Sequence, residues 1–260
     1  MPWSTLLVES SGFVTTITLN RPEKRNAISD RMMDELERAF DEIEKGPARA
    51  VIVTGAGKAF CAGMDLATLS AFSGASIEEV RHDARRVARM FRRINAFPKP
   101  LVAAVLGPAL AGGCGLATLC DFTLASPEAR FGYTEVRVGF IPAIISAFVV
   151  RQAGEKRARE LLLSARILSS EEARTFGLVS EIVPADRLME RARELAASLA
   201  DLSPEAVTHT KQLLVNAQAA ELERDLDLAI EASAAMRATE DFREGIAAFL
   251  EKRKPVWRGR

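Results

Sequence analysis

The chain has 260 residues, of which 48% are hydrophobic and 27% charged, as in an ordinary soluble globular protein with one large core or two modest domains. Lysines plus arginines number 35, as do aspartates plus glutamates, so the zero net charge argues against a globally basic surface for nucleic acid. The three cysteines stand far apart and there are two histidines, which argues against a disulfide framework, a thiolate metal site or a histidine-based catalytic cluster.

The chain shows no targeting or membrane-spanning segment. Residues 1–4 carry no basic-then-apolar signal, and no uninterrupted apolar run is long enough to cross a bilayer. We therefore expect a cytoplasmic enzyme that binds neither membrane nor nucleic acid.

The first quarter of the chain predicts two strands and a helix. Residues 14–19 alternate in a pattern typical of a strand. Ser29 or Asp30 can cap an amphipathic helix that follows. Residues 50–54 predict a buried strand, before a loop rich in small residues at 55–66.

Two glycines open a helix near the middle of the chain. A basic helix ending near Asn95 precedes a short apolar strand at 99–105, and the new helix starts at Gly112-Gly113. Backbone N–H groups at a helix start lack intrahelical partners and carry partial positive charge. Without a Cβ in the way, a ligand oxygen can approach them closely. This stretch could therefore hold a carbonyl that is becoming an oxyanion.

The second half becomes increasingly helical. We expect a strand at 122–125, an extended segment at 130–135, a helix at 149–163 and a short helix capped by Ser169. From residue 184 the pattern is helical almost to the end, with apolar stripes that pack on the core or on another subunit.

Three stretches are candidates for chemistry. The loop 60–66 also fits a tight turn, and the glycines at 111–113 also fit close helix packing. Glu135 stands in an apolar and aromatic stretch, although most glutamates are solvated surface groups. Together, two backbone donors and one carboxylate suit thioester chemistry, in which the donors stabilise an enolate oxyanion and the carboxylate moves a proton. Neither a cofactor nor a metal is required.

Four motifs in order carry a family resemblance: Asn-Arg-Pro-x-x-x-Asn-Ala at 20–27, Gly-x-Gly-x-x-Phe-x-Ala-Gly-x-Asp-Leu at 55–66, the glycine-opened helix from 111 to 121, and Phe-x-Glu-Lys-Arg at 249–253. From about residue 4 to its end the sequence resembles the crotonase superfamily, the enoyl-CoA hydratases and isomerases. The resemblance implies an α/β crotonase-type superhelix of ββα units with a C-terminal α-helical domain. It implies a core at residues 1–195, a helical trimerisation region at 196–260, an acyl-CoA substrate and a homotrimer or dimer of trimers.

The resemblance also implies roles for particular residues. The backbone N–H groups of Met64 and Gly112 would form the oxyanion hole, and Glu135 would handle the proton at the reacting carbon. The residues expected to bind CoA are Lys24, Arg25, Ala27, Ala62, Asp65 and Leu66, with Phe249 and Lys252 of this chain or of a neighbouring subunit. The residues expected to line the acyl pocket are Gly115, Phe140, Pro142 and Ile144.

The sequence departs from the family pattern at one catalytic position. Many hydratases of the family have a second glutamate where this chain has Gly115. Either Glu135 alone serves hydration, or the reaction is a double-bond isomerisation, for which one carboxylate suffices. The bulky segment 142–146 replaces a glycine-rich one and could reshape the acyl pocket; both departures resemble methylglutaconyl-CoA hydratases.

The expected activity is enoyl-CoA hydration. A catalytically silent CoA-binding or RNA-binding scaffold is the rival from another class, against which the retained Glu135 and the neutral charge argue. The basic helix before Asn95 either presents a solvated face, which we favour, or attracts CoA phosphates. Its arginines are Arg85, Arg86, Arg89, Arg92 and Arg93.

Overall fold

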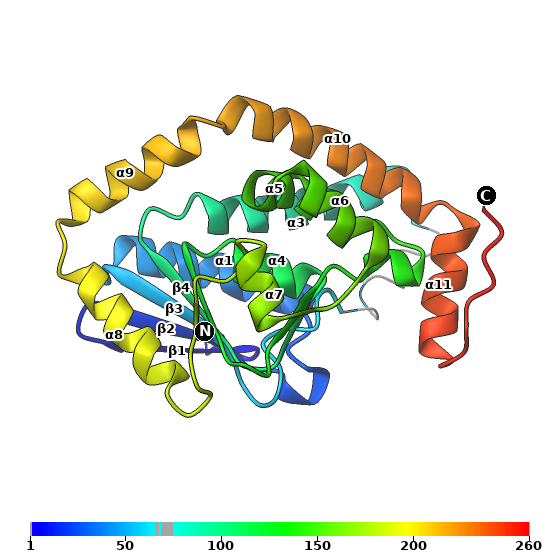
Figure 1. Cartoon of the computed structure of the whole chain (residues 1–260). Coiled ribbons are helices and arrows are strands. Elements are labelled where there is room, and N and C mark those ends of the chain that lie inside the picture. Colours follow the sequence, from blue (N-terminus) through cyan, green and yellow to red (C-terminus); the bar gives the residue numbers. More distant parts are fainter. Residues whose placement is uncertain (1, 66–67, 69–74, 260) are drawn as a thin grey trace.

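A six-stranded sheet forms the centre of the protein in this computed structural model, which describes residues 2–65, 68 and 75–259 (Figure 1). The strand order is β1-β2-β3-β4-β6-β9, with β1 antiparallel to β2 and the other neighbours parallel. The strands are β1 (Leu6–Ser11), β2 (Val14–Leu19), β3 (Ala50–Gly55), β4 (Leu101–Val105), β6 (Phe122–Ala125) and β9 (Glu181–Ile182). The strands predicted at 14–19, 50–54 and 122–125 are confirmed, and β1 and β9 were not predicted.

Helices cover both faces of this sheet. Residues of β3 and β4 are almost entirely buried, as expected for parallel strands in an α/β protein. On one face, Ile52 and Val102 pack against alanines of α8 (Leu188–Ala200). On the other face lie α1 (Asp30–Lys45), α3 (Ile77–Asn95) and α4 (Gly112–Thr118).

A second, three-stranded sheet brings the glycine-opened helix beside the loop that follows β3. It has the order β5-β7-β8, with β5 (Pro108–Leu110), β7 (Arg130–Gly132) and β8 (Leu168–Ser169). After leaving β4, the chain forms β5 and then enters α4. An isolated bridge between Cys61 and Ala109 joins the two loops. Two segments about 50 residues apart in sequence therefore lie together, and this juxtaposition positions the site.

Two sequence expectations between residues 130 and 163 were wrong. The extended segment ends at Gly132, and Glu135 begins a 3-10 helix, η2 (Glu135–Val138). The single helix predicted at 149–163 is two helices, α5 (Ala143–Ala153) and α6 (Glu155–Ser164). They are separated by Gly154, whose φ of 78° a helix does not accommodate. Pro142 directly precedes α5, which therefore starts six residues earlier than expected.

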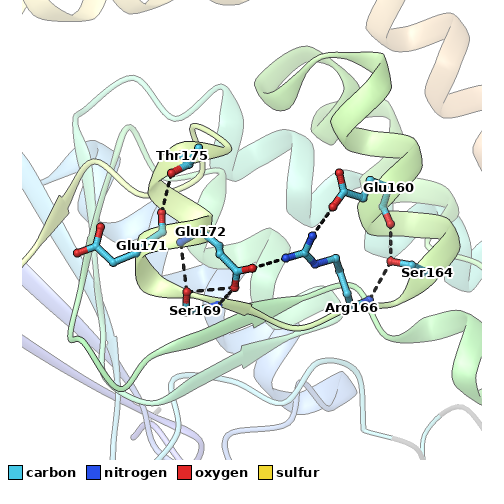
Figure 2. A network of polar contacts seen from close by, with 7 residues as sticks. All are labelled: Glu160, Ser164, Arg166, Ser169, Glu171, Glu172 and Thr175. Atoms are coloured by element: carbon cyan, nitrogen blue, oxygen red, sulfur yellow. Dashed lines mark hydrogen bonds and ion pairs between the residues drawn. The ribbon is translucent and has the colours of Figure 1, made fainter.

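Polar contacts join α6 to α7 (Ser170–Thr175) (Figure 2). The Ser169 N–H donates to Glu172 Oε2 at 2.8 Å in a capping box. Arg166 pairs with Glu160 of α6 and with Glu172 of α7. Arg137 of η2 donates to the carbonyl oxygen of Ala165, the residue before Arg166, at 2.6 Å. The network thus supports the segment against which η2 is anchored.

The tail forms an arch over the core. Figure 1 shows α9 (Pro204–Asn216) and α10 (Ala219–Arg237) extending over α3 and α5, and α11 (Glu240–Leu250) at the far end beside the C-terminus. Residue 195, where we expect the core to end, lies within α8. Within residues 2–65, 68 and 75–259, no helix combines the length and apolarity that crossing a bilayer requires.

The basic helix α3 is paired with acidic neighbours. Arg86 lies 2.8 Å from Asp30 and 2.7 Å from Asp34 of α1, and Arg92 lies 3.0 Å from Glu223 of α10. These pairs support the interpretation of α3 as an ordinary solvated face rather than a collector of phosphates.

Candidate active site

Asn26 holds together the first two motif loops. Its side chain is fully buried, and its Nδ2 donates to the carbonyl oxygens of Ala56 at 2.9 Å and Ala59 at 2.8 Å. Its Oδ1 accepts from the Arg21 N–H at 2.9 Å. Arg21 in turn pairs with Asp65 at 3.0 Å. The turn at 20–27 and the loop after β3 therefore form one hydrogen-bonded unit.

The amide nitrogens of Met64 and Gly112 lie close together. A Cβ atom on Gly112 would be 3.9 Å from the Met64 nitrogen, and a Cβ on Gly63 would be 3.3 Å from the Gly112 nitrogen. Neither N–H donates any of the turn, loop or cap hydrogen bonds found among the described residues. Ile28 fixes the loop by donating to Gly63 and accepting from Asp65, at 2.8 and 2.9 Å. Two neighbouring N–H groups thus have no partner among these hydrogen bonds, which is what an oxyanion hole requires.

The residue before Gly112 adopts an unusual backbone conformation. Ala111 has φ 50° and ψ −129°, and its N–H donates to the Gly132 carbonyl oxygen at 2.7 Å. Such strain at a non-glycine residue is typical of functional sites and costs about 1–3 kcal/mol. Gly113 has a packing role instead, because a Cβ there would lie 2.3 Å from the Cys61 carbonyl oxygen. The two glycines that open α4 therefore have different functions.

Glu135 carries a carboxyl group in an apolar setting. Its Oε2 atom is buried and has no hydrogen-bond partner within the described part of the chain. Burial raises the pKa of Glu135 to about 7, because the charged form loses its hydration. A carboxyl group with this pKa can both accept and release a proton near neutral pH.

One cavity of about 530 Å³ connects these groups. Lys24 and Arg25 contribute cationic side chains to its wall, and Phe91 and Ile145 contribute apolar ones. Twelve of the residues proposed from the sequence line it: Lys24, Arg25, Ala27, Ala62, Met64, Asp65, Gly112, Glu135, Phe140, Pro142, Ile144 and Phe249. The cavity wall thus includes two cationic residues, two backbone amides, the carboxyl group of Glu135 and many apolar side chains.

Comparison with known proteins decides the family. The sequence model of the enoyl-CoA hydratase/isomerase family matches residues 9–260. The chain belongs to this family. A protein from Thermus thermophilus is 45% identical over 245 residues, covering 94% of this chain and 97% of that protein. The 2,3-dehydroadipyl-CoA hydratase of Escherichia coli K12 is 36% identical, covering 99% of this chain and all of that enzyme.

A solved structure of an enoyl-CoA hydratase/isomerase from Xanthobacter autotrophicus Py2 superimposes with a TM-score of 0.88 at 33% identity, covering 96% of this chain and 97% of that one. The predicted crotonase-type α/β fold with its helical tail is therefore confirmed, as is the family inferred from the four motifs.

Two of the proposed residues, both described, do not line the cavity of this hydratase/isomerase-family protein, and a third is not described. Gly115 was expected in the acyl pocket, but a Cβ on it would lie 2.4 Å from Cδ1 of Ile145, which covers it. Lys252 follows α11, is exposed and lies outside the lining. Leu66 lies outside the described residues.

The end of α11 contributes two residues to the cavity lining within the same chain. Phe249 and Leu250 of α11 line the cavity. The helix packs tightly against η2, because a Cβ on Gly245 would lie 2.2 Å from the Val138 carbonyl oxygen and one on Gly139 would lie 2.2 Å from that of Asp241. Glu135 is thus positioned on an element that α11 holds directly.

Sequence analysis missed two polar lining residues, Ser233 and Arg237 of α10. One of the apolar stripes in the tail consists of Leu222, Leu226 and Ile230. At helical spacing this stripe continues through Ser233 and Arg237. Extending that stripe past its last apolar member was the available signal.

The cysteines near the site do not fit a nucleophilic role. Cys61 and Cys114 are fully buried, and burial raises the pKa of each thiol to about 12. Among the described residues, no group of three or more histidine, cysteine, aspartate or glutamate side chains could hold a metal ion.

Proposed function

We propose that this protein is an enoyl-CoA hydratase that adds water reversibly to a 2-trans-enoyl-CoA. One observation carries the proposal: the adjacent Met64 and Gly112 amides and the buried carboxyl group of Glu135 line the same cavity. Membership of the family and full-length similarity to a named enoyl-CoA hydratase support it.

The proposed reaction uses these groups in two steps. The thioester carbonyl oxygen accepts hydrogen bonds from the Met64 and Gly112 N–H groups. Ionised Glu135 takes a proton from water while the hydroxyl oxygen bonds to C3, and the electron pair of the double bond moves onto the thioester as an enolate. Protonated Glu135 then returns its proton to C2. One carboxyl group therefore both accepts the proton and returns it, and the two amides stabilise the negative charge that develops on the thioester oxygen.

The CoA portion is held outside the reacting centre. Lys24 and Arg25 line the cavity and would contact phosphate oxygens of CoA. Phe249 also lines it and would close over the nucleotide. CoA is part of the substrate, and the proposed reaction uses no separate cofactor or metal.

A second activity is favoured by the Gly115–Ile145 contact. Because the position of a second glutamate is filled, a reaction that needs one carboxyl group fits the site equally well. In an enoyl-CoA isomerase, Glu135 would move a proton between C2 and C4. A methylglutaconyl-CoA-type hydratase would use the hydration steps above on a short branched chain.

A panel of enoyl thioesters tests these alternatives. We expect the purified protein to hydrate crotonyl-CoA, with loss of the absorbance of the conjugated thioester and formation of the 3-hydroxyacyl product. Products with a shifted double bond and no added water would identify an isomerase instead. Acyl-CoA binding without turnover of any thioester would identify a silent scaffold, and RNA binding is tested in the same preparation.

We also propose that the protein assembles as a homotrimer or dimer of trimers in the cytoplasm. Leu213 and Leu214 of α9 and Leu228 of α10 are 72%, 70% and 66% exposed, which favours a covering partner. Free, buried cysteines are compatible with a reducing compartment. Light scattering showing a stable monomer would contradict the assembly, and cell fractionation tests the compartment.

A further inference from the structure

The acyl section of the cavity has two polar residues on a wall that is otherwise mainly apolar. Ser233 and Arg237 of α10 line the cavity and are 2% and 6% exposed. Their neighbours in this section are Ala84, Val87, Phe91, Phe140, Ile141, Ile144 and Ile145. Neither polar residue has a step to perform in the proposed hydration.

Arg237 is held in place by specific contacts. Its Nη1 donates to Asp83 Oδ2 of α3 at 2.7 Å, and both side chains are at most 3% exposed. Its guanidinium carbon lies 5.4 Å from the centre of the Phe140 ring, which also lines the cavity. Since Asp83 compensates the charge, the guanidinium is a built part of the wall and not a displaced surface group.

These two residues bring hydrogen-bond donor groups to a wall whose other members are mainly apolar. A guanidinium group donates and never accepts, and a serine hydroxyl group can donate. An alkyl chain against this wall offers these groups no acceptor, whereas an oxygen atom on the chain offers one.

We propose that this section selects enoyl thioesters whose acyl chain carries an acceptor oxygen at its far end, bound by Arg237 and Ser233. The inference rests on the proposed function for the position of the thioester. A terminal carboxylate and a terminal hydroxyl group share the required chemistry. The carboxylate gains a charge-assisted hydrogen bond, although the nearby Asp83 weakens its attraction.

The first experiment compares matched substrates. We expect kcat/KM for a six-carbon 2-enoyl-CoA to rise about tenfold or more when its terminal carbon bears a carboxylate or a hydroxyl group. Five- and seven-carbon series keep the test independent of the fit of one chain length. Preference for the carboxylate identifies an anionic tail, and equal preference identifies a neutral acceptor site. An alkyl thioester that reacts as fast as both oxygenated ones at every length overturns the proposal.

Two variants test the residues. Ser233→Ala removes the hydroxyl group from a helix that tolerates alanine. The double variant Asp83→Asn with Arg237→Gln removes both charges together, so no buried charge is left unpaired. The measured preference is the ratio of kcat/KM for the oxygenated chain to kcat/KM for the alkyl chain. We expect this ratio to fall several-fold in Ser233→Ala and to reach about one in the double variant. A preference that survives in both variants overturns the assignment to these residues.

A matched control is available at another ion pair that involves α10. Arg151 of α5 pairs with Asp225 of α10 at 3.0 Å but does not line this cavity. Arg151→Gln therefore removes an arginine pair of α10 without touching the acyl wall. We expect it to retain the wild-type preference.

A binding measurement separates this inference from the proposed function. Saturated six-carbon thioesters with and without a terminal carboxylate or hydroxyl group are titrated by calorimetry, which requires no turnover. Tighter binding of an oxygenated chain without turnover of any enoyl-CoA would overturn the hydratase and isomerase proposals but support this one. Turnover of enoyl-CoA with no preference for oxygenated chains, in rate or in binding, would support the proposed function and overturn this inference.

Discussion

Ile145 occupies the space that a side chain at residue 115 would need. A Cβ atom on Gly115 would lie 2.4 Å from Cδ1 of Ile145 and 3.2 Å from the Phe91 ring. The missing second carboxyl group is therefore not simply a deletion, because the neighbouring helix has filled its place. Three described acidic residues line the cavity, and of the other two, Asp65 is paired with Arg21 and Glu23 is exposed. Glu135 is left as the carboxyl group suited to proton transfer.

Introducing the second glutamate alone should damage the protein. Gly115→Glu forces atoms into space that Ile145 fills, and overpacking of this kind costs about 1–3 kcal/mol before the burial of a carboxyl group is counted. We expect a lower free energy of unfolding in urea and no gain in hydration rate.

The coupling to Ile145 is measurable by a double-mutant cycle. Ile145→Ala alone leaves a cavity and should destabilise by about 2–5 kcal/mol. In Gly115→Glu with Ile145→Ala, the new side chain has room, so the loss should be smaller than the sum of the single losses by about 1 kcal/mol or more. Additive losses would show that the two positions do not compete for space.

Gly63 keeps the Met64 and Gly112 amides, the proposed oxyanion hole, close together. Its φ is 95°, and a Cβ on it would lie 2.8 Å from the Ala111 Cβ and 3.3 Å from the Gly112 nitrogen. Gly63→Ala must displace the Gly112 amide or the Met64 loop. We expect kcat for hydration to fall by about 100- to 1,000-fold, the loss seen when one oxyanion-hole donor is removed.

Gly12 provides the control for backbone strain. It has φ 58°, lies in the β1–β2 turn, and a Cβ there would meet nothing within 4 Å. Gly12→Ala should destabilise the fold by about 1 kcal/mol and leave kcat unchanged. If Gly63→Ala also retained wild-type kcat, the adjacency of the two amides would not matter for catalysis.

Removing the carboxyl group of Glu135 should nearly abolish turnover. We expect Glu135→Gln to lower kcat by about 100- to 10,000-fold, because the amide neither takes a proton from water nor returns one to C2. Circular dichroism and thermal unfolding should show an intact fold, since Oε2 makes no hydrogen bond to a described residue. Substantial hydration by this variant would exclude Glu135 as the proton carrier.

The pH profile of the wild-type enzyme gives an independent measure of the same group. Hydration starts with ionised Glu135, whose pKa burial raises to about 7. We therefore expect kcat/KM for hydration to rise with pH and to reach half its plateau near pH 7. A profile that is flat from pH 5 to 9 would contradict a general base with this pKa.

Sequence reasoning found the parts of the site that local signals encode. The serine caps expected before α1 and α7 are confirmed, because the hydroxyl groups of Ser29 and Ser169 accept from the backbone. The small-residue loop at 60–66 and the glycines before α4 are likewise visible as patterns. Pairing of β3 with β4 and the bridge from Cys61 to Ala109 then bring the loops together. Topology thus converts two local signals into one site.

The parts that were missed depend on distant contacts. Arg237 meets Asp83 across 154 residues, and no spacing rule relates them. The cover of Ile145 over Gly115 depends on how α5 packs, which its apolar composition leaves open. Glu135 was expected at the end of an extended segment, 130–135, but Arg137 and the backbone of α11 fix residues 135–138 as η2. Tertiary packing, not local propensity, decides these features.

Glu135 should also make the fold less stable as pH rises. In the unfolded chain its pKa is near 4.5, whereas burial raises the pKa in the folded protein to about 7. Between these values the folded state binds more protons than the unfolded state, so the free energy of unfolding falls as pH increases. Above pH 7 the destabilisation from this group reaches about 3 kcal/mol.

Glu135→Gln removes this destabilisation, so the variant should be the more stable protein at pH 8.5 and should match the wild type at pH 4.5. Urea unfolding of both proteins at several pH values measures the difference, in which the contributions of all other groups cancel. An equal free energy of unfolding at pH 8.5 would mean that the carboxyl group is hydrated or paired in solution, and its proposed role as a neutral-pH proton carrier would fail with that result.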